Sequence, residues 1–402
     1  SGNNGVLNST VSSPTGFDTS GSDFLIGEWT NNVQSVRYQG DIAEVICYNA
    51  PITSNGFTQV SSYLAIKYGI PLNPTAIPNY LASNGSVIWS GVSNTAYSNT
   101  IIGIGRDDNS GLLQYQSSSS LGNDILTLGV GSITTSNAAN NAANPGMFGV
   151  DNSFLLVGNN AITSSVTNTS DLPTNPGTQL PMRMRMGRVW IAQVTGTISS
   201  ASLQFNLAGA FSSTVPYATT DLCLLIDRGN TGGFTSSISG TGVYQTATQI
   251  GGITSTVYQF SGITFNTGDR FTIGLVKKAQ SLAFAQQNYP MIVGQSSTIS
   301  ATLGSLTSAG TVTYSVVAGS GSATVNASNG LVTASGAGTL TLIASTTATV
   351  DYISATTSTL ITIGAGTPVL TLPVIGANSL TVDRNLIITA SSNPPTSTTQ
   401  QS

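Results

Sequence analysis

The sequence contains no histidine and very little charge. Only 6% of its 402 residues are charged, whereas roughly a quarter is usual in soluble proteins. Without histidine, the chain cannot build a Ser-His-Asp or Cys-His nucleophile system or an imidazole metal site. Its two glutamates, Glu28 and Glu44, leave few candidates for paired-carboxylate catalysis. We therefore expect a non-catalytic protein.

This scarcity of charge does not predict disorder, which needs low hydrophobicity together with high net charge. Hydrophobic residues make up 39% of the chain, and the net charge is only -4. The sequence can therefore form packed cores, and its length predicts two to four domains of ~100–200 residues each.

The sequence also lacks basic clusters and long apolar runs. The acidic balance argues against nucleic acid as a partner. No run approaches the ~18 apolar residues of a membrane span, and the first residues, SGNNGVLNST, are not a signal peptide. A surface made of hydroxyls, amides and glycine suits the outside of a cell, so we expect an extracellular location.

Apolar residues alternate with polar ones in short runs, which is typical of antiparallel β-strands. Examples are SVIWSG, DILTLGV, SFLLVG, RVWIAQV, ASLQFNLAG, RFTIGLV, TVTYSVVAG and TLTLIAS. One segment differs, because apolar residues of 53–68 recur at helical spacing. Thr53 or Ser54 can cap this amphipathic helix, and Gly69 and Pro71 can end it. The sequence thus predicts an all-β, multidomain protein with one helix.

The C-terminal region is almost free of charge and contains a repeat. Beyond residue 287 only Asp351, Asp383 and Arg384 are charged. A strand-rich unit over 288–365 is followed by a similar Pro-led order of strands from residue 366, which stops about halfway at Ser402. Because half of a sandwich leaves its strand edges open, we expect an array that continues.

Residues 40–72, GDIAEVICYNAPITSNGFTQVSSYLAIKYGIPL, carry a specific pattern. They resemble the end of laminin-G/concanavalin-like jelly-roll domains in large secreted surface proteins of Bacteroidetes-type bacteria. In that family a closing strand of the form G-x-I-A-E-V-I-x-Y precedes a helix that ends Y-L-A-x-K-Y-G. The matching positions include Glu44, Tyr63, Lys67 and Tyr68. About seventy-five residues are too few for such a jelly roll, so its front half is expected upstream of Ser1 or from a partner chain.

The resemblance extends along the chain. Segments such as IIGIGRDDNSGLLQYQS, GRVWIAQVTG and GDRFTIGLV look like the β-domain of unassigned function that follows these jelly rolls, and residues from about 288 resemble bacterial Ig-like repeats. The resulting expectation is a partial jelly roll over 1–75, a β-sandwich domain over 76–287, an Ig-like domain over 288–365 and the first half of a further repeat over 366–402.

The resemblance implies a structural or adhesive cell-surface protein of the adhesin type, often exported by the type IX route. Its expected partners are a surface glycan, a protein receptor, or neighbouring copies that add strands to its half-domains and form a fibre. The alternative is a carbohydrate-binding module of a larger secreted enzyme, since jelly rolls commonly host glycan sites.

Cys47 in EVICYN and Cys223 in DLCLLID each lie within an apolar, strand-like run. We expect two buried free thiols that pack as small hydrophobic groups, with a disulfide between them as the alternative.

The loop GRDDNSG offers the best candidate for a cation site. Asp107, Asp108 and Asn109 lie on a glycine-bounded turn and could give hard oxygen ligands to calcium. Asp and Asn are also ordinary turn residues, and the loop lacks the spacing of an EF-hand. The preceding G-I-G begins like a dinucleotide loop, but Asp108 stands where its last glycine is needed.

Two further groups of residues are candidates for ligand binding. Trp29, in GEWTNN, is a plausible exposed aromatic for stacking on a sugar, whereas Trp190 lies in an apolar strand and is expected in the core. Arg183, Arg185 and Arg188 form the main positive cluster. We expect them on a solvent-facing strand with aspartate partners, and an anionic glycan or partner protein is the alternative.

Overall fold

The computed structural model describes residues 2–3, 6–7, 39–73, 78–121, 124–173, 181–211, 217–228, 233–235, 241–244, 247–252, 255–304 and 309–366. Within these residues the chain forms two α-helices and several β-sheets, which confirms the all-β fold class. The residues divide into two compact units. The first takes its residues from 1–167, 186–212 and 224–273, and the second from 168–185, 213–223 and 274–402. The domain limits expected from the sequence stay a prediction.

Two sheets build the first unit. The larger has the strand order β18, β12, β9, β5, β6, and a further strand pair, β14 with β15, belongs to it. Their bounds are β5 Asn99–Asp107, β6 Leu112–Gln114, β9 Ser153–Asn159, β12 Trp190–Thr195, β14 Leu222–Asp227, β15 Thr241–Tyr244 and β18 Arg270–Val276. Of these, β14 belongs to the first unit from Leu224 on and β18 as far as Ile273. The other sheet has the order β16, β17, β13, β8, β7. Its bounds are β7 Gln116–Ser118, β8 Leu126–Gly129, β13 Ala201–Asn206, β16 Thr248–Ile250 and β17 Val257–Ile263.

Short elements complete the first unit. They are the strand pairs β1 Gly2–Asn3 with β2 Val6–Leu7 and β3 Tyr80–Leu81 with β4 Val87–Trp89, the helices α1 Ser54–Tyr68 and α2 Asn137–Ala143, and the 3-10 turn η1 Thr95–Tyr97. The strands β4, β8, β9, β12, β13 and β18 confirm six of the runs that alternation predicted.

Aromatic side chains pack between the two sheets of the first unit. Trp190 on β12 is fully buried. Its ring stacks on Phe271 of β18 at 5.7 Å between centroids and meets the edge of Phe205 of β13 at 5.4 Å. Such pairs stabilise a core by about 0.5–1.5 kcal/mol beyond the area that they bury. The expected core position of Trp190 is therefore confirmed.

The two glycines of the G-I-G sequence allow β5 to pack closely against β9. A Cβ atom at Gly103 would lie 2.8 Å from Cγ of Leu156, and one at Gly105 would lie 2.5 Å from Cδ1 of Phe154. Both neighbours belong to the paired strand β9. Glycine is needed there because the side chains of β9 occupy the space over the β5 backbone.

Helix α1 begins and ends where its sequence predicts. The side chain of Thr53 accepts a hydrogen bond from the backbone N–H of Gly56 at 3.1 Å, and Gly69 ends the helix in a left-handed conformation with φ of 61°. Ala65 and Ile66 are buried and belong to the same apolar cluster as Trp89 of β4 and Phe154 of β9. The helix therefore packs directly on the strands that follow it.

The segment before the helix departs from the prediction. Residues 41–48 form no strand, and Cys47 is exposed rather than buried. Alternation alone predicted a buried strand here, but a strand also needs a hydrogen-bonded neighbour, and no described strand pairs with this segment. Cys223 is buried as expected, and both cysteines are free thiols.

The arginine cluster is buried, which corrects the expected solvent-facing strand. The exposed fractions of Arg183, Arg185 and Arg188 are 1%, 7% and 7%. Their expected aspartate partners are present: Arg183 pairs with Asp351 at 3.2 Å, Arg185 with Asp171 at 2.6 Å, and Arg188 with Asp124 at 3.3 Å. Guanidinium groups tolerate burial only with such partners, which lie 14, 64 and 168 residues away and therefore outside the strand's own pattern.

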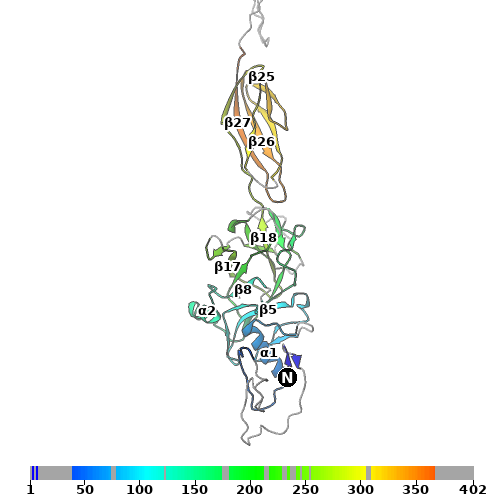
Figure 1. Ribbon diagram of the computed structural model, residues 1–402, viewed down its shortest axis with the longest axis vertical. Helices are drawn as coiled ribbons and strands as arrows, with labels where there is room; N and C mark the ends of the chain where they lie inside the picture. Colours follow the sequence, from blue (N-terminus) through cyan, green and yellow to red (C-terminus); the bar gives the residue numbers. More distant parts are fainter. Residues whose placement is uncertain are drawn as a thin grey trace, which may run out of the picture. The chain divides into compact units, whose positions relative to one another are not determined.

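The second unit contains a β-sandwich. One sheet has the order β20, β27, β26, β23 and the other β21, β25, β24, with a short pair β19–β22 beside them. The bounds are β19 Leu282–Phe284, β20 Asn288–Ile292, β21 Ser296–Thr298, β22 Ala301–Leu303, β23 Val312–Ala318, β24 Ser322–Val325, β25 Leu331–Gly336, β26 Gly338–Thr346 and β27 Ala355–Gly364 (Figure 1). The strands β23 and β26 confirm the last two of the runs that alternation predicted.

The strand order of this sandwich is that of an immunoglobulin fold. In the letters used for that fold, β21, β25 and β24 correspond to strands B, E and D, and they face β23, β26 and β27, which correspond to C, F and G. Strand β20 pairs in parallel with the last strand, β27. A single apolar cluster that includes Val332, Leu342 and Ile361 fills the space between the sheets. The expected further repeat over 366–402 lies outside the described residues, apart from residue 366.

The second unit also holds β10 Thr167–Asn168 from Asn168 on, β11 Met182–Met186 as far as Arg185, and the turn η2 Thr219–Asp221.

Hydrogen bonds tie the segment before β19 to the loop between β26 and β27. Lys278 donates its backbone N–H to Asp351 O at 2.8 Å, and its ammonium group pairs with Asp221 at 3.1 Å. The buried amide of Gln280 donates to Ile353 O at 2.6 Å and accepts from the N–H of Gly310 at 2.8 Å. These contacts, together with the pair Arg183–Asp351, fix the entry into the sandwich.

The buried pairs lead to a prediction for stability. Arg188→Met should lower the free energy of unfolding by about 3–5 kcal/mol, because it leaves the buried carboxylate of Asp124 without its counter-charge. The measurement is urea denaturation followed by tryptophan fluorescence. The control is Arg106→Met, which breaks a pair with the exposed Asp108 and should leave the midpoint almost unchanged. Equal shifts in the two variants would contradict the prediction.

The two thiols should differ in reactivity. Cys47 is exposed, whereas Cys223 is fully buried and burial raises the pKa of its thiol. In the native chain, Ellman's reagent should therefore modify one thiol quickly and the other only after unfolding in guanidinium. Cys47→Ser should abolish the fast reaction, and Cys223→Ser should leave it intact. Two fast thiols in the native chain would show that the burial of Cys223 is wrong.

Candidate functional site

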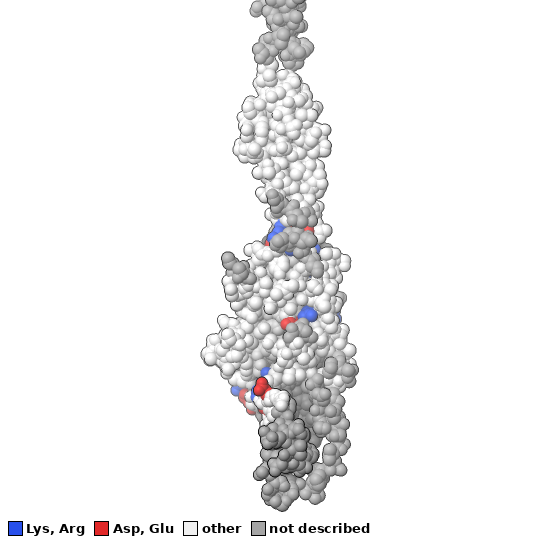
Figure 2. Space-filling model, in the orientation of Figure 1, with Lys and Arg blue, Asp and Glu red and all other residues white. Residues whose placement is uncertain are grey.

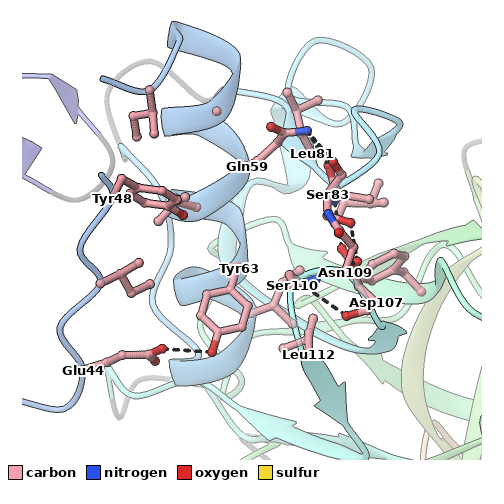
Figure 3. Close-up of a pocket in the computed structure, with 18 residues that line it drawn as sticks. Glu44, Tyr48, Gln59, Tyr63, Leu81, Ser83, Asp107, Asn109, Ser110 and Leu112 are labelled. Carbon is pink, nitrogen blue, oxygen red and sulfur yellow. Dashed lines mark hydrogen bonds between the residues drawn. The ribbon is translucent and has the colours of Figure 1, made fainter. Parts of the chain in front are cut away.

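A pocket with a volume of about 440 Å³ lies beside helix α1 in the first unit (Figure 3). We call it the helix pocket. Its walls come from the segment 44–52, from one side of helix α1, from the β3–β4 hairpin, and from the turn that joins β5 to β6. Such a volume falls within the range of ~300–1,000 Å³ that is typical of small-molecule sites.

The segment before the helix presents alternate side chains to the helix pocket. Glu44, Ile46 and Tyr48 all line it, and the residues between them do not. Alternate residues of an extended chain share a face. One face of this segment therefore forms a wall of the pocket, although the segment is not part of a sheet.

A cluster around Glu44 holds this wall against the helix. The carboxylate accepts hydrogen bonds from Tyr63 at 3.0 Å, from Lys67 at 2.8 Å and from Tyr68 at 2.9 Å. Lys67 also donates to the hydroxyl of Tyr63 at 2.6 Å, and its ammonium lies over the rings of both tyrosines. The four residues of this Glu44 cluster are positions at which the sequence matched the jelly-roll pattern, and the fold brings them into contact.

The charges of the Glu44 cluster stabilise one another. The hydrogen bond from Lys67 lowers the pKa of Glu44 below its ordinary value, and the bonds from Tyr68 and Tyr63 act in the same direction. In return, Glu44 and then Tyr63 raise the pKa of Lys67. Both groups are therefore ionised at neutral pH.

The opposite wall is held by hydrogen bonds between α1, the β3–β4 hairpin and the end of β5. Gln59 donates its amide to Ser83 O at 2.8 Å and to Ala82 O at 3.2 Å. Ser83 in turn donates its backbone N–H to Asp107 at 2.8 Å, and its hydroxyl also donates to that carboxylate. The helix and the hairpin therefore meet in a fixed arrangement at the pocket (Figure 3).

The residues expected to bind calcium have different surroundings. Asp107 is buried, and its two carboxylate oxygens accept hydrogen bonds from Ser83 and Ser110. Asp108 is exposed and forms a two-point ion pair with Arg106, at 2.7 and 2.8 Å. Both carboxylates thus have partners within the protein, and the calcium site stays a prediction. The described residues contain no group of three or more acidic or cysteine side chains placed for a metal.

Asn109 does line the helix pocket, next to Asp107. Within the described part of the chain its amide makes no side-chain hydrogen bond, and neither the hydroxyl of Tyr48 nor Oε1 of Gln59 has a partner there. Tyr48 is 45% exposed. The pocket thus combines an apolar floor, which includes Ile66 and Phe154, with polar groups that are free to bind a ligand.

Comparison with known protein families matches residues 57–269 to a domain of unknown function, DUF8202, and this match covers more than half of the chain. The chain belongs to the DUF8202 family. The DUF8202 region contributes helix α1 from Phe57, the hairpin and the strands of the helix pocket. The wall formed by residues 44–52 precedes it.

Other comparisons add little to this family assignment. A search of curated proteins gives no match. Among solved structures, the crystal structure of mouse cadherin-23 EC22-24 is similar over 53% of this chain and 74% of its own. The sequence identity is 13% and the TM-score 0.18, so this similarity carries no argument about the DUF8202 site.

Sequence reasoning found part of the helix pocket. It named Asp107 and Asn109, which line the pocket, and Asp108, which does not. It missed Tyr48, Gln59 and the wall-forming role of Glu44, although alternation of Glu44, Ile46 and Tyr48 gives a usable signal. Trp29 lies outside the described residues. Among the described residues no helix is long and apolar enough to cross a membrane.

The lowered pKa of Glu44 predicts a pH dependence of stability. Because its folded pKa lies below the ordinary value of 4.5, the Glu44 cluster stabilises the fold above that pH and loses this effect as the pH falls through the folded value. Lys67 is 37% exposed, so we expect Glu44→Gln to cost only about 0.5 kcal/mol at neutral pH.

Urea denaturation of both proteins at several pH values measures this difference. It should shrink toward zero as the pH falls through the folded pKa of Glu44, below which the carboxyl group is protonated in both states. Lys67→Met should show the same pH dependence. A difference between wild type and Glu44→Gln that stays constant across the range would contradict the role of the carboxylate charge.

Proposed function

We propose that this protein is a non-catalytic adhesive protein of the bacterial cell surface. Its DUF8202 region binds a glycan in the helix pocket, and its Ig-like sandwich acts as a structural spacer. The surface location, export by the type IX route and the adhesin class rest on the sequence resemblance of residues 40–72 and of the regions that follow.

The lining of the helix pocket carries the proposal. Sugar rings offer apolar C–H faces and hydroxyls that both donate and accept hydrogen bonds. Tyr48 offers a partly exposed ring for the C–H face, Asn109 offers an unengaged amide group for hydroxyls, and Gln59 offers its amide oxygen as an acceptor. This combination fits a glycan better than a purely apolar or a highly charged ligand.

The carboxylates of the helix pocket favour binding over hydrolysis. A glycosidase needs one carboxylic acid that keeps its proton at the working pH. The pKa of Glu44 is lowered by Lys67, so Glu44 is ionised and is a poor general acid. Asp107 already accepts hydrogen bonds from Ser83 and Ser110. Both carboxylates thus act in positioning the walls.

The chemistry of the sandwich suits a spacer. Within residues 288–366, Asp351 is the sole charged side chain, and the face shown in Figure 2 carries no blue or red surface on the sandwich. Such a surface is insensitive to salt and pH, because screening and titration act on charges. Strand pairing and the apolar cluster therefore maintain the module under changing external conditions.

The alternative is a carbohydrate-binding module of a larger secreted enzyme. The same pocket lining favours it, since both functions need a sugar site. The two differ in ligand: an adhesin recognises branched cell-surface glycans, whereas a module of a polysaccharide-degrading enzyme recognises the polymer. Binding to other copies or to a protein receptor is a third outcome for the same protein.

The test is a glycan array probed with the full chain, with soluble cellulose and xylan oligosaccharides included. We expect dose-dependent binding to one class of glycan. Tyr48→Ala and Asn109→Ala should each weaken it about three- to tenfold, from loss of ring contact and of one hydrogen bond. The control Val92→Ala changes a residue that is 85% exposed and lies outside the pocket, and it should leave the affinity unchanged.

Each outcome is informative. Binding to cell-surface glycans supports the adhesive function, and binding to the polymers alone supports the alternative. Absence of binding to any glycan, or binding that Tyr48→Ala and Asn109→Ala leave unchanged, would remove the glycan site. Hydrolysis of a glycan that is abolished by Glu44→Gln or Asp107→Asn would overturn the non-catalytic function.

A further inference from the structure

A second cavity of about 440 Å³ lies elsewhere on the first unit. We call it the second pocket. It is lined by residues 70–71 after helix α1, by η1 and the first residues of β5, by Leu121, and by residues 159–161 at the end of β9. The second pocket shares no lining residue with the helix pocket.

A buried polar network holds the wall of the second pocket. Asp124, whose side chain is 1% exposed, pairs with Arg188 at 3.3 Å. The same carboxylate accepts hydrogen bonds from Thr100 at 2.9 Å and from Asn159 at 3.1 Å. Thr100 and Asn159 are themselves buried and both line the pocket. Charge-assisted hydrogen bonds to Asp124 thus hold this wall of the pocket in place.

Two residues of this wall adopt conformations that side chains rarely adopt. Thr100 has φ of 46° and Ala161 has φ of 61°. A positive φ is a marked outlier for a β-branched residue such as threonine and costs of order 1–3 kcal/mol. The strain persists because Asn159 accepts the N–H of Ala161 at 2.9 Å and Asp124 accepts the hydroxyl of Thr100. Backbone strain of this kind concentrates at sites that bind ligands.

The second pocket offers unengaged polar groups next to apolar ones. Asn99 donates one amide hydrogen to Asn159 at 3.0 Å, which leaves its carbonyl oxygen and its other N–H for a ligand. The hydroxyl of Ser98 donates to Asn94 O and keeps its acceptor capacity. On the rim, Ile70 is 39% and Leu121 55% exposed. No charged or aromatic residue is among those that line the pocket.

We propose that the second pocket binds a neutral carbohydrate unit. Hydroxyls of the sugar meet Asn99 and Ser98, and the C–H face of its ring lies against Ile70 and Leu121. An anionic sugar is disfavoured, because no cation lines the pocket and Arg188, which contacts Asp124 behind its wall, is already paired. The proposal does not rest on the helix pocket, whose ring and amides belong to other residues.

The test is saturation-transfer NMR on the full chain with glucose, galactose, mannose and N-acetylglucosamine, and with glucuronic acid as the anionic comparison. The background carries Tyr48→Ala and Asn109→Ala, so that the helix pocket is impaired. We expect a neutral sugar to give signal in this background. Adding Asn99→Ala should reduce that signal at least threefold.

Two further variants keep the test decisive. Leu121→Ala changes an exposed rim residue, so the chain should stay folded. This variant should weaken binding of the neutral sugar about twofold or more, even if Asn99→Ala lowers the melting temperature. Val92→Ala, outside both pockets, should have no effect.

The proposal is overturned if no neutral sugar gives signal in the background chain. It is also overturned if neither Asn99→Ala nor Leu121→Ala changes the signal. The same holds if glucuronic acid is the one sugar that gives a signal dependent on these two residues. If the helix pocket variants abolish all glycan binding, the helix pocket remains a glycan site and the second site is removed. If the signal depends on Asn99 but not on Tyr48 or Asn109, the second site remains and the helix pocket is removed as a glycan site.

Discussion

Burial of arginine in a chain with so little charge constrains much of this structure. A buried guanidinium group costs several kcal/mol unless a carboxylate and further hydrogen bonds compensate it. Arg183, Arg185 and Arg188 follow one another within six residues, and each meets an aspartate from another part of the chain. Arg183 and Arg185 lie on β11, where a shift by one residue would turn their side chains to the opposite face and separate both pairs. These two pairs therefore specify the register of β11, and the pair Arg188–Asp124 holds the segment that follows the strand.

The Glu44 cluster acts in a comparable way on a smaller scale. It fastens a segment without strand partners among the described residues to helix α1, and in doing so forms one wall of the helix pocket. The other wall depends on Gln59 and on the hydrogen bonds between Ser83 and Asp107. Polar groups that could have bound ligands are thus engaged in positioning, and those that remain free, on Tyr48 and Asn109, face the cavity.

Periodicity predicted the strands and the helix because both depend on local chain geometry. Alternation identified β9, β12 and β26, and the cap residues Thr53 and Gly69 defined helix α1. The same reasoning was wrong for Cys47, since alternation says nothing about whether a partner strand exists. It was wrong about exposure of the arginines, because Asp351 lies far from Arg183 in the sequence. The sequence indicated Asp107 and Asn109 of the helix pocket, but each pocket assembles residues from many elements, so neither cavity as a whole could be predicted.

The placement of charge in the sandwich has a consequence for degradation. Asp351 is paired with Arg183, and no lysine or arginine occurs between Lys278 and Arg384. Trypsin-like proteases cleave after these two residues, so the whole sandwich offers them no peptide bond to cut. The absence of lysine also removes amines that aldehydes and other electrophiles attack. The sandwich would in this way resist a large class of proteases through its composition, before its folded stability is considered.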